Sequence, residues 1–163
     1  MTLVEEMSGE SDRAVAVVGA AWVEEAIGKA IESFLENHSE AKQRLFNGAG
    51  PLATFSAKID LARLLGLMTD AIHSDLHTVR KIRNDFAHLV AHKTEHTRLT
   101  FSSDHIKDKC LALRCVTTER HTDPRVAFTR ACATLNADFE MIGFFGVKLS
   151  DGGRVFAKGV DEA

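Results

Sequence analysis

The chain has 163 residues, of which 45% are hydrophobic, and a net charge of -3 at pH 7. This length and composition predict one folded domain that buries a substantial core. The charge lacks the basic excess with which non-specific DNA binders neutralise phosphates, so we do not expect direct DNA contact.

The sequence shows no sign of a membrane or secreted protein. It contains no uncharged apolar run long enough to span a bilayer, and its N-terminus, "MTLVEEMSGESDR", is acidic and polar, unlike a signal peptide. We therefore expect a cytoplasmic protein. The three cysteines, Cys110, Cys115 and Cys132, are odd in number and lack CxxC spacing, which predicts reduced core thiols in place of disulfides or a zinc site.

The first half of the chain has the pattern of three helices. Ser11 and Asp12 can cap a helix through "RAVAVVGAAWVEEAIGKAIESFLEN", whose first part is apolar on nearly every side and suits a central position. "SEAKQRLF", from Ser39, predicts a short second helix that the turn "NGAGP" ends. A third helix within "LATFSAKIDLARLLGL" should end at Gly66. Its apolar stripe consists of Phe55, Ile59, Ala62 and Leu64 or Leu65.

The second half predicts three more helices, of which one carries the motif described below. "DHIKDKCLALRCVTT" is periodic, with Ile106, Cys110 and Leu113 in step. The last helix should begin with Asp123 as N-cap and Pro124 in its first position, and should extend towards Phe145.

These patterns predict an all-α single domain, a bundle of six or seven helices. We expect a flexible N-terminus over residues 1–11, the helical domain over 12–146 and a loosely ordered tail over 147–163, which is rich in glycine. Strands should be at most a minor element of this tail.

The remaining helix carries "KIRNDFAH", residues 81–88, and should begin near Asp75 and end between His88 and Lys93. Its buried stripe is predicted to be Leu76, Val79, Ile82, Phe86 and Val90. The opposite side carries His73, His77, Lys81, Asn84 and His88. Arg83 projects about 140° away from His88, at the margin of the buried stripe.

The polar residues of this stretch admit two interpretations. The guanidinium of Arg83 could bind phosphate while His88 moves a proton at a ribose 2′-hydroxyl, which would cleave RNA without a metal. Alternatively, Arg83 and Asp85 pair with neighbouring helices, while Asn84 and His88 cap carbonyls or hold the "NGAGPL" turn. Composition alone favours the structural interpretation.

Two other candidate sites are set aside. "NGAGP" lacks the GxxxxGK[ST] order of a phosphate loop, so Asn47, Gly48, Gly50 and Pro51 are expected to form a structural turn. Histidines repeat at i, i+4, a spacing that can present two metal ligands from one helix face. They are His73 and His77, and His88, His92 and His96. A site needs three or four converging ligands and no carboxylate has evident ligand spacing, so we predict no metal and no cofactor.

The segment "RLFNGAGPLATFSAKIDLARLLGL" followed by "DLHTVRKIRNDFAH" resembles the mannitol operon repressor family, also called the MltR-like family. The resemblance covers about Asp12 to Ala137. It implies an all-helical domain and a role in repressing a sugar-alcohol operon, without implying direct DNA contact. We therefore expect a non-enzymatic, transcriptional-regulator-like binding protein that acts as a homodimer or through a protein partner.

A wider resemblance rests on Arg83, Asn84 and His88, which match the Rx4-6H pattern of HEPN domains. These are small helical bundles that often dimerise, and some are metal-independent ribonucleases of toxin and defence systems. The resemblance implies that Arg83 and His88 are catalytic, that Asn84 orients them, and that a two-fold partner completes the cleft. The alternative function is therefore a metal-independent endoribonuclease acting on RNA.

Overall fold

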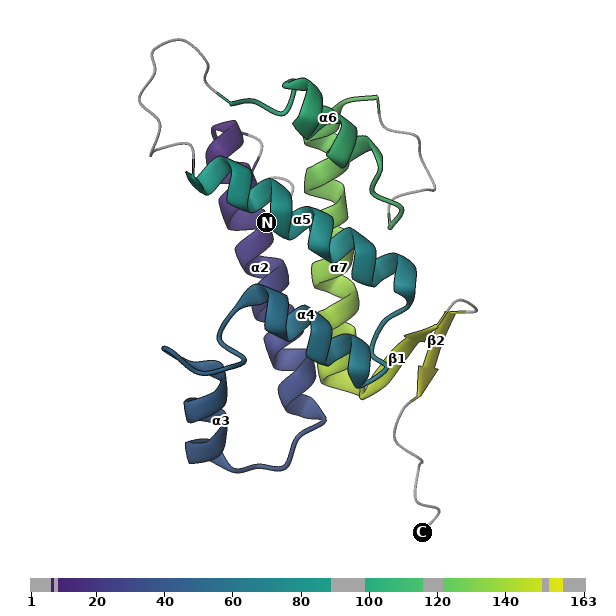
Figure 1. Cartoon of the computed structure of the whole chain (residues 1–163). Helices are drawn as coiled ribbons and strands as arrows, with labels where there is room; N and C mark the ends of the chain where they lie inside the picture. The colour runs from purple at the N-terminus through teal and green to yellow at the C-terminus, as the bar shows by residue number, and fades with distance from the viewer. Residues whose placement is uncertain (1–6, 8, 89–98, 116–121, 151–152, 157–163) are drawn as a thin grey trace.

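The computed structural model describes residues 7, 9–88, 99–115, 122–150 and 153–156. Over these residues the chain forms six α-helices followed by a small β-hairpin (Figure 1). The predicted all-α bundle is confirmed. Within this part of the chain, no helix is both long and apolar enough to cross a membrane.

The helices are α2 (Asp12–Ser33), α3 (Ser39–Phe46), α4 (Phe55–Leu64), α5 (Asp70–His88), α6 (Asp104–Leu111) and α7 (Pro124–Phe145). Strand β1 (Val147–Ser150) pairs antiparallel with β2 (Gly153–Phe156), and Val147 lies opposite Phe156. Part of the tail that we expected to be loosely ordered therefore forms a regular hairpin, the minor strand element allowed for by the sequence.

The predicted caps of the first and last helices are present. The Ser11 side chain accepts a hydrogen bond from the Ala14 amide, and the Asp123 carboxylate accepts from the amides of Arg125 and Val126. Each cap satisfies amide groups that have no partner inside the helix. The starts of α2 and α7 thus follow directly from their sequences.

Three predicted boundaries are wrong, and the first is the end of α6, which lies at Leu111 and not at the end of "DHIKDKCLALRCVTT". Helix α2 ends at Ser33 instead of Asn37, because the amides of Phe34 and Leu35 bond back to carbonyls three residues earlier and form a tight turn. Helix α5 begins at Asp70 instead of near Asp75. Asp75 is a buried residue inside the helix, and its carboxylate accepts a hydrogen bond from a segment distant in the sequence, as described below.

Helices α2 and α7 lie side by side and run in the same direction (Figure 1). Small residues permit their close packing: a Cβ atom at Gly143 would lie 3.5 Å from the Cα atom of Ala30, and one at Gly19 would lie 3.3 Å from the Cys132 Sγ atom. At the N-terminal ends, the Arg125 guanidinium donates to the Asp12 carboxylate.

Helices α4, α5 and α6 pack against this pair. Helices α4 and α5 pack against α2, while α6 packs mainly against α7. The Phe101 ring joins two of these elements, because its centroid lies 5.1 Å from that of Phe86 on α5 and 5.3 Å from that of Phe128 on α7. The core therefore extends continuously from α2 and α7 to α5.

The close approach at Gly143 predicts a size-dependent effect on stability. Gly143→Ala adds a methyl group at ordinary contact distance and should change stability little, whereas Gly143→Leu should lower it by roughly 1 to 3 kcal/mol through overpacking. Thermal unfolding followed by circular dichroism measures both. Equal melting temperatures for the two variants would contradict the close packing.

Candidate functional site

The apolar face of α5 orients the motif helix. Leu76, Val79, Ile82 and Phe86 are all buried, as predicted, and Val90 lies outside the described residues. This stripe faces the core, so the polar residues between its members occupy the sides and the outer face of the helix.

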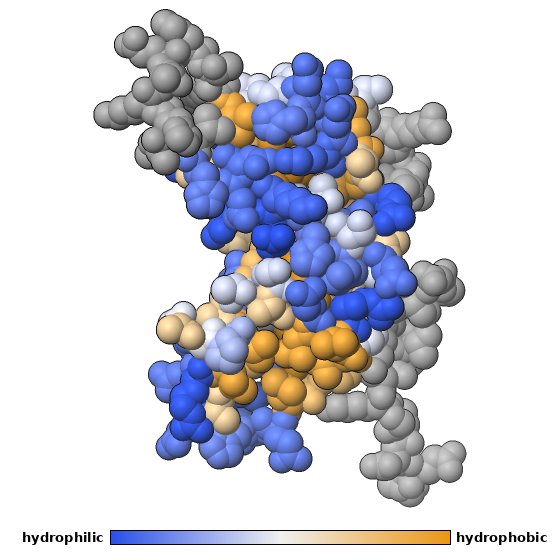
Figure 2. All heavy atoms as spheres, in the orientation of Figure 1, coloured by the Kyte–Doolittle hydropathy of each residue, from blue (hydrophilic) through white to orange (hydrophobic). Residues whose placement is uncertain are grey.

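The polar residues of the motif have different surroundings. The Arg83 Nη1 atom donates to the Asn84 Oδ1 atom over 3.1 Å, and the Asp85 carboxylate accepts from Lys109 on α6. His88 is the exposed last residue of α5. Figure 2 shows a largely hydrophilic surface over α5 and α6. Asp85 therefore pairs with a neighbouring helix, whereas the guanidinium of Arg83 bonds to the adjacent side chain.

The turn formed by Asn47, Gly48, Gly50 and Pro51 is not brought together with this motif. It follows α3, at the opposite end of the bundle from the C-terminal end of α5 (Figure 1). Gly48 has a φ of 61°, and a Cβ atom at Gly50 would lie only 2.4 Å from the Leu45 carbonyl oxygen. Both positions therefore require glycine for the shape of the turn.

A buried carboxylate on α5 was not identified as a site residue from the sequence. The Asp75 Oδ2 atom accepts from the amides of Arg114, over 2.8 Å, and Cys115, over 2.7 Å. These two amides follow α6, so Asp75 fixes the end of that segment against α5. No local spacing indicates this contact, because the residues involved are about 40 positions apart.

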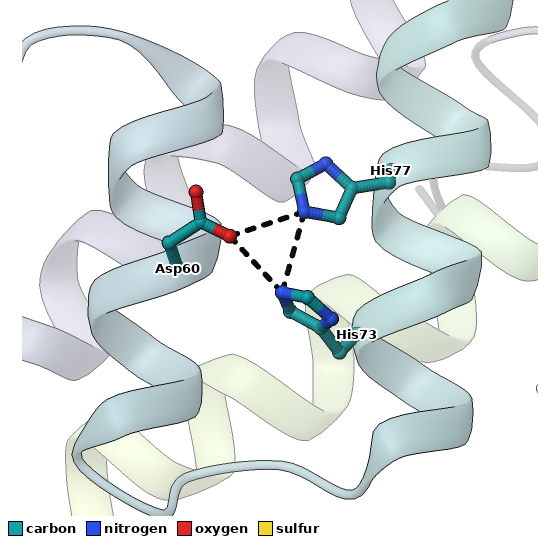
Figure 3. A group of neighbouring side chains, drawn as sticks. All are labelled: Asp60, His73 and His77. Carbon is teal, nitrogen blue, oxygen red and sulfur yellow. Dashed lines mark hydrogen bonds and ion pairs between the residues drawn. The ribbon is translucent and has the colours of Figure 1, made fainter.

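A second polar cluster joins α4 to α5 (Figure 3). The Asp60 Oδ1 atom on α4 lies 3.1 Å from the Nε2 atom of His73 and 3.2 Å from that of His77, and the two Nε2 atoms are 3.3 Å apart. Hydrogen bonding to His73, and secondarily to His77, lowers the pKa of Asp60 below its usual value. We call these three residues the Asp60 cluster.

The Asp60 cluster contains a residue that sequence reasoning missed. The spacing of His73 and His77 was recognised as that of two potential metal ligands, but Asp60 is on another helix. In the described part of the chain, the three side chains could together hold a metal ion. In the sequence, the one indication that Asp60 lies near the two histidines is that the predicted helices that carry them are consecutive and joined by a short connection.

The cysteines lie in the core as predicted. Cys110 and Cys132 are buried, Cys115 is partly buried, and all three are free thiols. Burial raises the pKa of Cys110 to about 12 and also raises the pKa values of Cys115 and Cys132. At neutral pH they are therefore protonated thiols, which are poor nucleophiles and poor metal ligands.

These observations define an all-α bundle with a polar motif at the end of α5 and a carboxylate–histidine cluster between α4 and α5. No family model and no curated protein sequence matches the chain. Among solved structures, the X-ray structure of the MtlR–HPr complex from Escherichia coli contains a similar chain, with a TM-score of 0.68 and 16% identity. The match covers 85% of this chain and 96% of that one, so this chain has an MtlR-like fold.

Substitution of Asp75 should lower stability, whereas substitution of His88 should leave it nearly unchanged. Asp75→Ala removes the acceptor of two backbone amides. Leaving a buried amide without a hydrogen-bond partner costs about 1 to 3 kcal/mol, so this variant should have a melting temperature several degrees lower. Asp75→Asn keeps an acceptor oxygen and should be milder. His88→Ala, at an exposed position, should stay within about 0.5 kcal/mol of the wild type. A large loss of stability in His88→Ala would instead favour the structural interpretation of the motif, in which His88 caps carbonyls or holds a turn.

Proposed function

We propose that this chain is a non-enzymatic, transcriptional-regulator-like binding protein of the mannitol operon repressor type that acts through a protein partner in the cytoplasm. The observation that carries the proposal is its MtlR-like fold, because the similar chain was crystallised in a complex with HPr. The net charge of -3 supports a protein partner over DNA.

An apolar groove on α7 offers a surface for that partner. It has a volume of about 700 Å³, and its lining includes Lys29 of α2 and Met141, Phe144 and Phe145 of α7. The Phe144 side chain is 82% exposed, which is unusual for a large aromatic residue in a folded domain. Exposed aromatic residues are frequent anchors in protein interfaces, so we assign this groove to the partner.

The first test is a calorimetric titration of the full chain with HPr from the same organism. Binding is expected, and Phe144→Ser should weaken it at least about tenfold, because loss of an interface aromatic anchor commonly removes 2 kcal/mol or more. Leu64→Ser is the matched control: Leu64 is 84% exposed but lies on α4, which contributes no residue to the lining of the groove.

The outcomes distinguish the identity of the partner from the location of the surface that binds it. Absence of HPr binding by the wild type would contradict HPr as the partner. If the wild type binds and only Leu64→Ser is impaired, the partner uses α4 and not the groove. Self-association of the wild type in sedimentation, lost in Phe144→Ser, would assign the groove to a second copy of the chain.

The second candidate function is the metal-independent endoribonuclease. It is favoured by two observations on the described residues: His88 is exposed at the end of α5, and the hydrogen bond of the Arg83 guanidinium goes to the Asn84 amide oxygen and not to a carboxylate. An exposed imidazole can move a proton, and an arginine that is not bonded to a carboxylate can bind phosphate, so both groups suit metal-independent RNA cleavage.

This candidate is tested by incubating the wild-type chain with varied RNAs in the presence of EDTA. We expect no cleavage from a binding protein. Cleavage by the wild type that is lost in both Arg83→Ala and His88→Ala, with Lys81→Ala as an exposed control on the same helix, would establish the ribonuclease instead.

A further inference from the structure

We propose that Asp60, His73 and His77 form a binding site for a divalent transition-metal ion of the Zn²⁺ class. Two borderline imidazole nitrogens beside one carboxylate oxygen suit Zn²⁺, Co²⁺, Ni²⁺ and Fe²⁺ better than Ca²⁺ or Mg²⁺, which prefer oxygen ligands throughout. The donor atoms come from two helices and converge on one point between them (Figure 3).

The size of the donor triangle fits one ion. Its sides are 3.1, 3.2 and 3.3 Å. Ligand atoms at the usual zinc distances of about 2.0 to 2.1 Å, arranged tetrahedrally, are separated by about 3.3 to 3.4 Å. An ion lying about 0.9 Å out of the plane of the triangle would therefore contact all three atoms at these distances without any helix having to move.

Hydrogen bonding alone does not account for this arrangement. If both Nε2 atoms carry hydrogens, each can donate to Asp60, but the 3.3 Å contact between the histidines then brings two donors together. If His77 lacks the Nε2 hydrogen, its lone pair faces the carboxylate oxygen. At most two of the three contacts can be hydrogen bonds, whereas one cation satisfies all three lone pairs.

The two helices are held in place independently of these ligands. The Gly66 φ of 70° and the Leu67 amide bond to the Ala62 carbonyl close the end of α4. The Arg63 guanidinium then bonds the Asp70 carboxylate at the start of α5, with distances of 2.7 and 2.8 Å. Because this connection is short and fixed, the three ligands are arranged in advance of binding.

The site leaves coordination positions open. The Asp60 side chain is 57% exposed, and those of His73 and His77 are 30% and 23% exposed. Three protein ligands leave at least one position of a zinc ion for water or an incoming group, since zinc takes four or more ligands. The cation would therefore join α4 to α5 and present an accessible metal at the surface.

The test uses the full chain, freed of metal by a chelator, and titrates it with Co²⁺ followed by visible absorption. Zn²⁺ is then added as the competitor. We expect one ion per chain, displaced by Zn²⁺. Affinity should fall at least about 100-fold in His73→Ala/His77→Ala, because loss of an outer-shell partner alone commonly weakens metal binding 10- to 100-fold. Asp60→Asn should weaken binding while keeping the shape of the side chain.

His105→Ala is the matched control, since His105 is an exposed histidine on α6, and it should bind as the wild type does. Zn²⁺ should also raise the melting temperature of the wild type and not that of the double variant, since a ligand stabilises only the state that binds it. The proposal is overturned if the wild type binds Zn²⁺ no more tightly than the double variant, whether both bind it elsewhere or neither binds it.

Discussion

The parallel packing of α2 against α7 is the constraint on which the rest of the structure depends. Two helices in this orientation place the positive ends of their dipoles together, which is unfavourable unless negative charge lies nearby. Asp12 and Asp123 supply that charge at the two N-termini. Arg125 then connects the ends by donating to Asp12 and to backbone carbonyls of Met7 and Glu10. Small residues along the helices allow the remaining contact.

Helix α5 carries both candidate sites on a rigid support. Its buried stripe fixes its rotation, so the histidines near its beginning face α4 and the motif near its end faces α6 and solvent. At 1.5 Å per residue, His77 and His88 are about 16 Å apart along the helix axis. The two sites therefore cannot share one small ligand, and a change at one can be studied with little disturbance of the other.

The sequence predicts what depends on neighbouring residues. Ser11, Asp123 and Pro124 mark helix starts because capping requires only the next few amides, and the stripe of α5 follows from helical periodicity. Contacts across the fold were not predictable in the same way. Asp75 was expected near the start of a helix because aspartate favours that position. In the structure its carboxylate instead accepts hydrogen bonds from two backbone amides that follow α6. The convergence of Asp60 with two histidines likewise depends on how α4 and α5 pack.

The pairing of the first and last long helices also has a consequence for how the chain reaches this structure. Residues 34 to 123 separate α2 from α7, so the central contact of the bundle is a distant one in the sequence. Helical bundles dominated by local contacts fold fastest, and closing so long a loop slows the search. During synthesis, α2 must wait for almost the whole chain before its partner exists. Until then only α4 and α5 can cover part of its apolar surface, and the part that faces α7 stays exposed.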